Sequence, residues 1–233
     1  VHAIRQLRID KLRHQISRAP SLVRLSAGAK GTSRVVAIGA STGGPSALMQ
    51  LFSAFAEPPP FAFFVSQHMP GGFTQGFAER LNRLTNLRAR EARDGDAPEA
   101  GTILLAPGEN HLEFTAKGDR VVTRLVPRTP SDKYAPAVDR MFESAAKHFG
   151  SDLLAVVLTG MGDDGRRGVQ AVKDHGGRVI AESEETAVIF GMPQRAIRTG
   201  FVDAVLPLSE IATAIQSGIG GSESKTIHRK GSK

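Results

Sequence analysis

The chain contains no cysteine and no tryptophan, and its only tyrosine is Tyr134. Without cysteine it has no disulfide bond, no thiolate metal site and no cysteine nucleophile, a composition that agrees with a cytoplasmic protein. No stretch approaches the roughly 18 apolar residues that a membrane-spanning helix needs. The first residues, VHAIRQLRIDKLRH, are charged throughout and lack the apolar core of a secretory signal. We therefore expect neither secretion nor membrane insertion.

The net charge of +7 is distributed unevenly along the 233 residues. Residues 1–33 contribute +6 and residues 217–233 contribute +3, which leaves −2 for residues 34–216. A basic protein raises nucleic acid as a partner, but here the positive charge belongs to the two ends. Because the body has no basic stripe, we expect no nucleic-acid partner.

Composition also divides the chain into a folded body and two ends. Residues 1–18 carry apolar residues at helical spacing and predict a short amphipathic helix. Residues 19–33 are rich in Ala, Ser and Gly and predict a linker, and residues 217–233 have the composition of a disordered tail. The body, residues 34–216, is long enough for one α/β domain with a full core.

Within the body, short apolar runs alternate with amphipathic segments. The expected strands are Arg34–Gly39, Phe61–Ser66, Leu153–Leu158, Arg178–Ala181 and Phe201–Leu206. The expected helices are Pro45–Phe55, Phe73–Asn86, Ala137–His148 and Arg166–His175, with others near 194–199 and 208–217. This pattern is typical of a doubly wound, mostly parallel sheet in a three-layer α/β/α arrangement. Residues 102–125, interrupted by PGENH and KGD, predict a hairpin at an antiparallel edge.

Ligands of such sheets bind in the loops at the carboxyl ends of the strands. Three segments stand there: GASTGG (39–44), QHMPGG (67–72) and TGMGDDG (159–165). The first contains G-x-S-x-G between a strand and a helix, the setting of a nucleophile elbow around Ser41. The alternative is a glycine-rich phosphate loop, although the spacing matches neither G-x-G-x-x-G nor G-x-x-x-x-G-K-[ST].

The other two loops supply a base and an acid. His68 is the only histidine at the carboxyl end of an expected parallel strand, and a serine nucleophile needs such a base; the alternative is a helix cap. Asp163 and Asp164 are adjacent acids that suit helix N-caps, a divalent cation or the orientation of an imidazole. The residues alone do not choose between these roles, or between the two acids.

Several ordered motifs together resemble the catalytic domain of the bacterial chemotaxis protein-glutamate methylesterases, the CheB family. They are VVAIGASTGGP, SQHMPGGFTQGFAERLN, ILLAPGENHLEF, PAVDRMFESAA, VVLTGMGDDGRRG and VIFGMPQRAI, and they cover about residues 34–216. The resemblance implies a serine hydrolase that removes methyl groups, as methanol, from glutamate γ-methyl esters of chemoreceptors. Many members also deamidate receptor glutamines.

The resemblance also implies roles for individual residues. Ser41 corresponds to the nucleophile, His68 to its base and Asp164 to the orienting acid, while position 163 is commonly Asn in the family. The backbone N–H groups of Thr42 and Met161 are the expected oxyanion donors. Tyr134, which stands where some members have His, and Gly162 are expected to line the site.

Partners and regulation follow from the same resemblance. The expected partner is the cytoplasmic helical bundle of a methyl-accepting receptor, and neither a metal nor a cofactor is expected. Family members usually carry an N-terminal receiver domain of two-component signalling, so residues 1–33 are interpreted as the linker that would follow it. We expect a monomer. The competing hypotheses are a nucleotide-binding module, a partner-binding domain with an inactive site, and an esterase acting outside chemotaxis.

Overall fold

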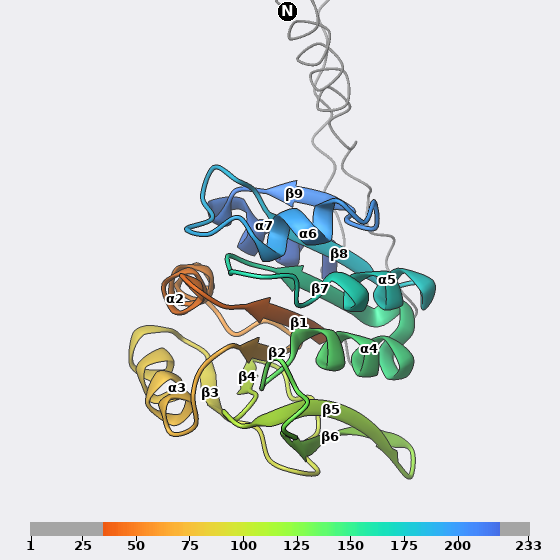
Figure 1. Cartoon of the computed structure of the whole chain (residues 1–233). Coiled ribbons are helices and arrows are strands. Elements are labelled where there is room, and N and C mark those ends of the chain that lie inside the picture. The colour runs from red at the N-terminus through yellow and green to blue at the C-terminus, as the bar shows by residue number, and fades with distance from the viewer. Residues whose placement is uncertain (1–34, 220–233) are drawn as a thin grey trace, which may run out of the picture.

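A computed structural model describes residues 35–219, and its centre is a seven-stranded sheet of order β3-β4-β2-β1-β7-β8-β9 (Figure 1). Every neighbouring pair in this sheet is parallel. The strands are β1 (Val35–Ala40), β2 (Ala62–Gln67), β3 (Arg88–Glu91), β4 (Thr102–Leu105), β7 (Leu153–Val157), β8 (Arg178–Glu182) and β9 (Ala204–Leu206).

The central strands are buried along their whole length. In β1, β2 and β7 no residue is exposed, which is why these strands appear in the sequence as continuous apolar runs and not as alternating ones. β1 lies between β2 and β7, with Val36 opposite Phe63 on one side and Leu154 on the other. The expected parallel sheet is thus confirmed.

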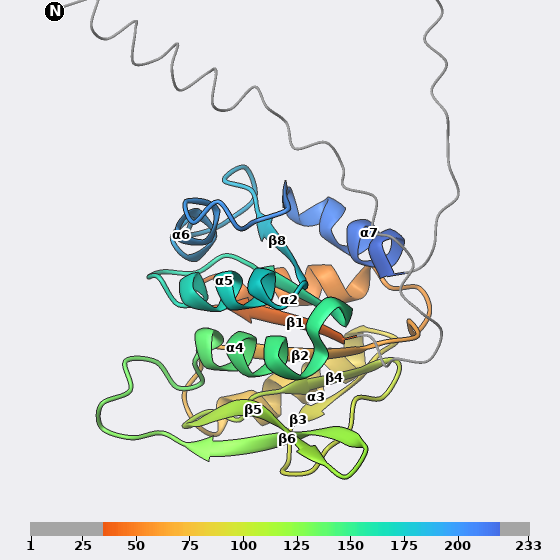
Figure 2. The ribbon, with the colours of Figure 1, turned by 90° about the vertical axis from the view of Figure 1, so that its right-hand side faces the viewer.

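Helices cover both faces of the sheet, so the expected three-layer architecture is confirmed (Figures 1 and 2). One hydrophobic cluster joins the sheet to α2, α3 and α7, and a second joins it to α4, α5 and α6. The helices are α2 (Gly44–Ser53), α3 (Phe73–Leu84), α4 (Val138–Phe149), α5 (Arg166–Asp174), α6 (Met192–Ile197) and α7 (Leu208–Ile219), with a 3-10 turn at Gly150–Asp152.

The expected hairpin forms, but not at the edge of the main sheet. Strands β5 (Asn110–Lys117) and β6 (Arg120–Pro127) pair antiparallel in a two-stranded sheet of their own, which packs on α4 (Figure 2). Ser144 of α4 fastens it, because its hydroxyl accepts from Phe114 N (2.8 Å) and donates to Phe114 O (3.2 Å). The first part of the expected hairpin, TILL, is instead the buried parallel strand β4, and the edge belongs to β3.

Strand order places a topological switch point in the middle of the sheet. From β1 the chain forms β2 and then the edge strand β3, and it comes back to place β4 between these two. It later returns to the other side of β1 to form β7, β8 and β9. The helices that follow β1 and β7 therefore lie on opposite faces of the sheet. The carboxyl ends of two such strands are where ligands of open α/β sheets generally bind.

A large stability effect is expected at Phe63, a fully buried side chain of β2. Its ring makes edge-to-face contacts with Phe52, Phe55 and Phe61, at centroid distances of 5.0, 5.3 and 5.3 Å. Phe63→Ala should lower the free energy of unfolding by about 3–5 kcal/mol, measured by urea denaturation. Phe73→Ala removes a ring that is 67% exposed and should change it by less than about 1 kcal/mol. Equal losses in the two variants would contradict this packing.

The ends of the chain are only partly described. The last helix continues past residue 216 to Ile219, into the range expected to be a tail. The expected helix and linker of residues 1–33, and the rest of the expected tail, lie outside residues 35–219. Over the part that is described, none of the helices combines the length and the apolar content needed to cross a bilayer.

Candidate active site

The three glycine-rich loops identified in the sequence meet at the switch point. Backbone hydrogen bonds join them, since Ser41 N donates to Thr159 O at 3.0 Å and His68 N donates to Ala40 O at 3.0 Å. The loops after β1, β2 and β7 therefore have fixed positions relative to one another before any side chain is considered.

Ser41 lies at a sharp turn between β1 and α2. Gly43 directly precedes the helix with φ of 82°, a conformation that glycine adopts without strain, and Gly44 N donates to Ser41 O at 2.8 Å. A Cβ on Gly43 would lie 2.7 Å from Val188 Cβ, so the turn also has no room for a side chain. These features produce the elbow that the G-x-S-x-G pattern predicts.

The side chains of Ser41, His68 and Asp164 form one hydrogen-bonded chain. Ser41 Oγ lies 3.1 Å from His68 Nδ1, and His68 Nε2 lies 2.7 Å from Asp164 Oδ2. Because the carboxylate accepts, Nε2 carries the hydrogen and Nδ1 presents its lone pair to the serine hydroxyl. The two ring nitrogens thus exchange the roles that they have in chymotrypsin-like proteases.

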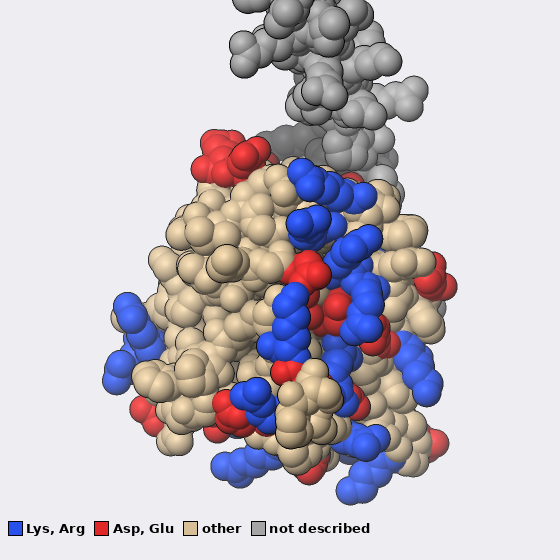
Figure 3. All heavy atoms as spheres, in the orientation of Figure 1, with Lys and Arg blue, Asp and Glu red and all other residues tan. Residues whose placement is uncertain are grey.

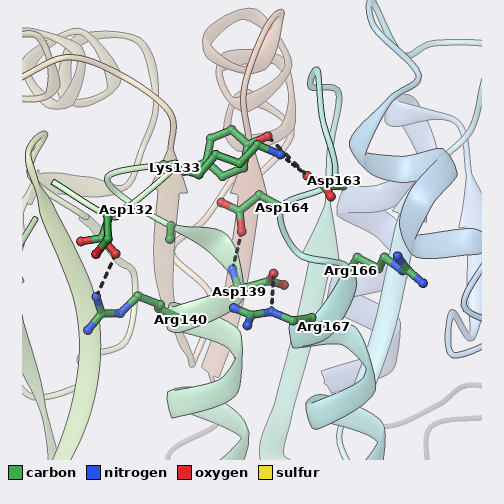
Figure 4. A pocket seen from close by; sticks show the side chains of 11 residues that line it. Asp132, Lys133, Asp139, Arg140, Asp163, Asp164, Arg166 and Arg167 are labelled. Atoms are coloured by element: carbon green, nitrogen blue, oxygen red, sulfur yellow. Dashed lines mark hydrogen bonds and ion pairs between the residues drawn. The ribbon is translucent and has the colours of Figure 1, made fainter. Parts of the chain in front are cut away.

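The carboxyl of Asp164 is buried and surrounded by donors. Oδ2 accepts from Val138 N (2.7 Å) and Oδ1 from Asp139 N (2.8 Å) and Gly165 N (3.0 Å), in addition to His68. Val138 and Asp139 begin α4, whose N-terminus favours a negative charge (Figure 4). Since every partner donates, the site is built for an ionised carboxylate.

Asp163 has a different environment, and geometry thus separates the two adjacent acids. Its carboxylate is exposed and accepts from Lys133 Nζ at 2.9 Å. That hydrogen bond holds the pKa of Asp163 below its usual value. Of the two acids, the structure brings Asp164 to His68.

Gln67 belongs to the site although the sequence interpretation did not single it out. Its buried side-chain amide donates to Ser41 O at 2.9 Å and to His68 O at 3.0 Å, and so holds together the backbones that carry these two side chains. In the sequence, Gln67 could have been recognised as a polar residue at the end of a buried strand, directly before His68.

A second buried hydrogen-bond network, centred on Thr159, supports the loop that carries Ser41. Thr159 N donates to Glu182 Oε2 at 2.7 Å, and Thr159 Oγ1 donates to Thr42 O at 2.9 Å and accepts from Ile189 N at 2.9 Å. Glu182 is fully buried, and this burial raises the pKa of its carboxyl. The network ties the loops after β1, β7 and β8 together.

Glu182→Gln should reveal the raised pKa as a pH-dependent stability difference. A carboxyl whose pKa is raised in the folded state stabilises the fold below its unfolded pKa, and this contribution is lost as the pH rises through the folded value. Glutamine does not titrate, so the melting temperature of the variant relative to the parent should increase as the pH rises from the ordinary glutamate pKa of 4.5 through the raised pKa of Glu182. A constant difference across this range would contradict the assignment.

The N–H groups expected to bind an oxyanion, those of Thr42 and Met161, lie beside Ser41. In the hydrogen bonding among residues 35–219, neither Thr42 N nor Met161 N has an acceptor. Gly160, which precedes Met161, approaches Ser41 so closely that a Cβ on Gly160 would lie 2.8 Å from Ser41 Cβ. Both N–H groups thus belong to backbone that borders Ser41 and are free to donate.

Tyr134 and Gly162, the other expected lining residues, also lie at the site. The Tyr134 ring stacks on the His68 imidazole with centroids 4.6 Å apart and planes 9° apart. A Cβ on Gly162 would lie 2.5 Å from the Tyr134 hydroxyl.

The surroundings of the site combine charged and apolar surface. Charged side chains of both signs form a band over the α4 and α5 side, and the area toward α2 is almost free of charge (Figure 3). Exposed apolar side chains at the site include Met161 (71%) and Val188 (66%). A cavity of about 390 Å³ lies beside Asp164 (Figure 4). Residues 35–219 hold no group of three or more His, Asp or Glu placed to bind a metal ion.

Known proteins resemble this chain in sequence and in fold. Residues 36–215 match the family described as CheB methylesterase. Protein-glutamate methylesterase/protein-glutamine glutaminase 3 of Geobacter sulfurreducens is 51% identical over 185 residues, which cover 79% of this chain and 50% of that protein. The corresponding enzyme 1 of Myxococcus xanthus is 49% identical over 181 residues, which cover 78% of this chain and 52% of that protein.

A solved structure agrees with these matches. The crystal structure of the Thermotoga maritima CheB methylesterase catalytic domain superimposes with a TM-score of 0.76 at 40% sequence identity, covering 80% of this chain and 99% of that one. The chain spans about half the length of the two curated relatives described above. The matched region includes the three loops that meet at the switch point, and the chain belongs to the CheB methylesterase family.

Proposed function

We propose that this chain is a serine hydrolase that removes methyl groups from glutamate γ-methyl esters of chemoreceptors, with Ser41 as nucleophile, His68 as base and Asp164 as orienting acid. The observation that carries the proposal is the hydrogen-bonded chain from Ser41 Oγ through His68 to Asp164. Membership of the CheB methylesterase family supports the choice of ester.

In the first half-reaction, Ser41 Oγ attacks the ester carbonyl while His68 Nδ1 takes its proton. The C–O bond to the methoxy group then breaks, His68 returns the proton to the leaving oxygen, and methanol departs. A γ-glutamyl ester of Ser41 remains. Asp164 holds the imidazole in the tautomer that has Nδ1 free, and its negative charge stabilises the imidazolium that forms.

In the second half-reaction, a water molecule takes the place of methanol. His68 Nδ1 accepts a proton from the water as it attacks the acyl carbonyl, and then gives this proton to Ser41 Oγ as the acyl bond breaks. The products are a free glutamate carboxyl on the receptor and the regenerated serine. No cofactor enters either half-reaction.

We assign the oxyanion of both tetrahedral intermediates to the N–H groups of Thr42 and Met161. Neither has an acceptor within the described part of the chain, and both border Ser41. Donors that are held by the fold and aimed at a developing charge typically supply about 3 kcal/mol each. The networks of Gln67 and Thr159 would keep these two backbone segments in register.

The same site would act on glutamine side chains, since an amide differs from the ester only in its leaving group, here ammonia. The exposed apolar side chains around Ser41 suit a substrate that is a side chain on a protein surface. We further propose a cytoplasmic, monomeric catalytic domain that acts on the helical bundle of a methyl-accepting receptor, with a receiver domain as its regulatory partner.

Methanol release from a receptor fragment carrying radiolabelled γ-methyl esters tests the proposal. The chain should release labelled methanol in proportion to the glutamate carboxyls formed, and mass spectrometry should show whether receptor glutamines are also converted. Loss of the label without formation of glutamate, or no release from any methylated receptor fragment, would contradict the proposed reaction.

A further inference from the structure

Tyr134 lies flat on the imidazole that the proposed reaction uses. The two rings are nearly parallel, 9° apart, with centroids separated by 4.6 Å. Tyr134 belongs to the segment between β6 and α4, whereas His68 follows β2, so the contact joins parts of the chain that are far apart in sequence. The ring covers one face of His68, whose side chain is only 14% exposed.

An ion pair holds Tyr134 from outside. Lys133 Nζ lies 2.9 Å from Asp163 Oδ1 and 4.9 Å from the centre of the Tyr134 ring, and the Tyr134 hydroxyl lies 3.4 Å from the same Asp163 oxygen. Asp163 precedes Asp164 in the loop after β7. Figure 4 shows the Lys133–Asp163 pair spanning the two loops next to Asp164.

The backbone before and after Tyr134 is also fixed by hydrogen bonds. Asp132 accepts from Thr129 N (2.6 Å) and Thr129 Oγ1 (2.8 Å), which hold the pKa of Asp132 well below its usual value. The fully buried His111 accepts from Ala137 N at 3.2 Å, and its Nε2 lies 3.2 Å from Asp132 Oδ2. The hydrogen bonds of Asp132 and His111 therefore fix the backbone on both sides of Tyr134.

The opposite loop leaves space for this arrangement. Gly162 has φ of 101°, and a Cβ there would lie 2.5 Å from the Tyr134 hydroxyl. A residue with a side chain at 162 would be strained in this backbone conformation and would displace the tyrosine. The position of Tyr134 therefore depends on features of both loops.

From this geometry we propose that Tyr134 is a positioning residue that holds the His68 ring in the plane between Ser41 and Asp164. We further propose that the Lys133–Asp163 ion pair, here called the clasp, keeps Tyr134 in this position. Two hydrogen bonds through Nδ1 and Nε2 fix an axis of the imidazole but leave tilting about that axis open. A ring stacked on one face opposes this tilt. The inference rests on the role proposed for His68, and it adds two residues that act through Tyr134.

Loss of the Tyr134 ring should lower kcat more than loss of the Lys133–Asp163 ion pair. An exposed ion pair contributes little by itself, so loss of Lys133 or Asp163 should lower kcat only a few-fold. Loss of the aromatic ring leaves the imidazole free to tilt, and small misplacements of a catalytic group can cost up to about 100-fold. Tyr134→Leu should therefore lower kcat by about 10- to 100-fold, with little change in KM.

The position of the ring can be measured without any assay of activity. An aromatic ring stacked on an imidazole shifts the imidazole proton resonances upfield, and His68 can be identified among the seven histidines by its absence in His68→Gln. In the NMR spectrum of the free chain, Tyr134→Leu should remove the upfield shift, and Tyr134→Phe should retain it together with most of kcat. Because this readout needs no substrate, failure of the proposed esterase reaction would not be mistaken for failure of the stacking.

The clasp is tested by exchanging its charges. Lys133→Met and Asp163→Asn should each reduce the upfield shift, and the double variant Lys133→Glu with Asp163→Lys should recover part of it. Lys147→Met removes an exposed lysine at the far end of α4 and should leave both the shift and kcat unchanged. The proposal is overturned if Tyr134→Leu retains the His68 resonances and kcat of the parent, and its clasp is overturned if the single variants match Lys147→Met.

Discussion

Ser41→Ala is expected to reduce methanol release from methylated receptor by about six orders of magnitude in kcat, the loss seen when a serine hydrolase loses its nucleophile. The reason is chemical, because the methyl of alanine has no oxygen to attack the ester carbonyl, and no other hydroxyl is placed against His68 Nδ1 in residues 35–219. Release should be followed with radiolabelled methyl esters, so that rates far below that of the parent are measurable.

The matched control is Ser46→Ala, which removes an exposed hydroxyl from the first turns of α2. It should retain the activity of the parent. Because Ser41 Oγ has a single hydrogen-bond partner in the described part of the chain, Ser41→Ala should also keep the melting temperature within a few degrees. A folded Ser41→Ala chain that still turns over at the rate of the parent would contradict the nucleophile assignment.

Asp164→Asn should lower kcat by about 10⁴, the second largest effect. Four donors converge on this carboxyl, from Val138 N, Asp139 N, Gly165 N and His68 Nε2. An asparagine must turn its own NH₂ toward some of them. If it turns toward His68, Nε2 has to accept, the ring hydrogen moves to Nδ1, and the imidazole can no longer take the proton of Ser41.

Asp163→Asn provides the control for this substitution at the neighbouring residue. It makes the same chemical change one position away, in an exposed side chain, and should lower kcat only a few-fold through Lys133 and Tyr134. Single-turnover rates of the two variants on the same receptor fragment should thus differ by about three orders of magnitude. Similar rates would show that burial of Asp164 against His68 has no part in catalysis.

The strands were predicted well from the sequence where helices cover both faces of the sheet. Strands β1, β2 and β7 are continuous apolar runs because both of their faces are covered. Strand β3, RARE, was missed because only Ala89 is buried there, and an edge strand needs no apolar run. The segment TILL was wrongly predicted to be part of the hairpin. Its four buried residues form β4, a parallel strand inside the main sheet.

The loops of the candidate site could be predicted from the sequence. The buried polar residues that hold these loops in place could not. The rule of strand carboxyl ends selected the three loops that contain Ser41, His68 and the Asp163–Asp164 pair. It could not choose between the two acids, because the choice depends on N–H groups at the start of α4, about 25 residues earlier in the chain. Gln67 and Glu182 were not identified, since their partners are backbone groups of other loops that no local pattern reveals.

Covalent labelling of Ser41 tests the proposed nucleophile most directly. An active-serine reagent of the fluorophosphonate class should label Ser41 alone, methanol release should fall in proportion to the labelled fraction, and His68→Gln should prevent the labelling. Peptide mapping of the labelled chain locates the adduct. Full methanol release from a chain whose Ser41 is completely labelled would contradict the role of Ser41, and with it the reaction proposed for this site.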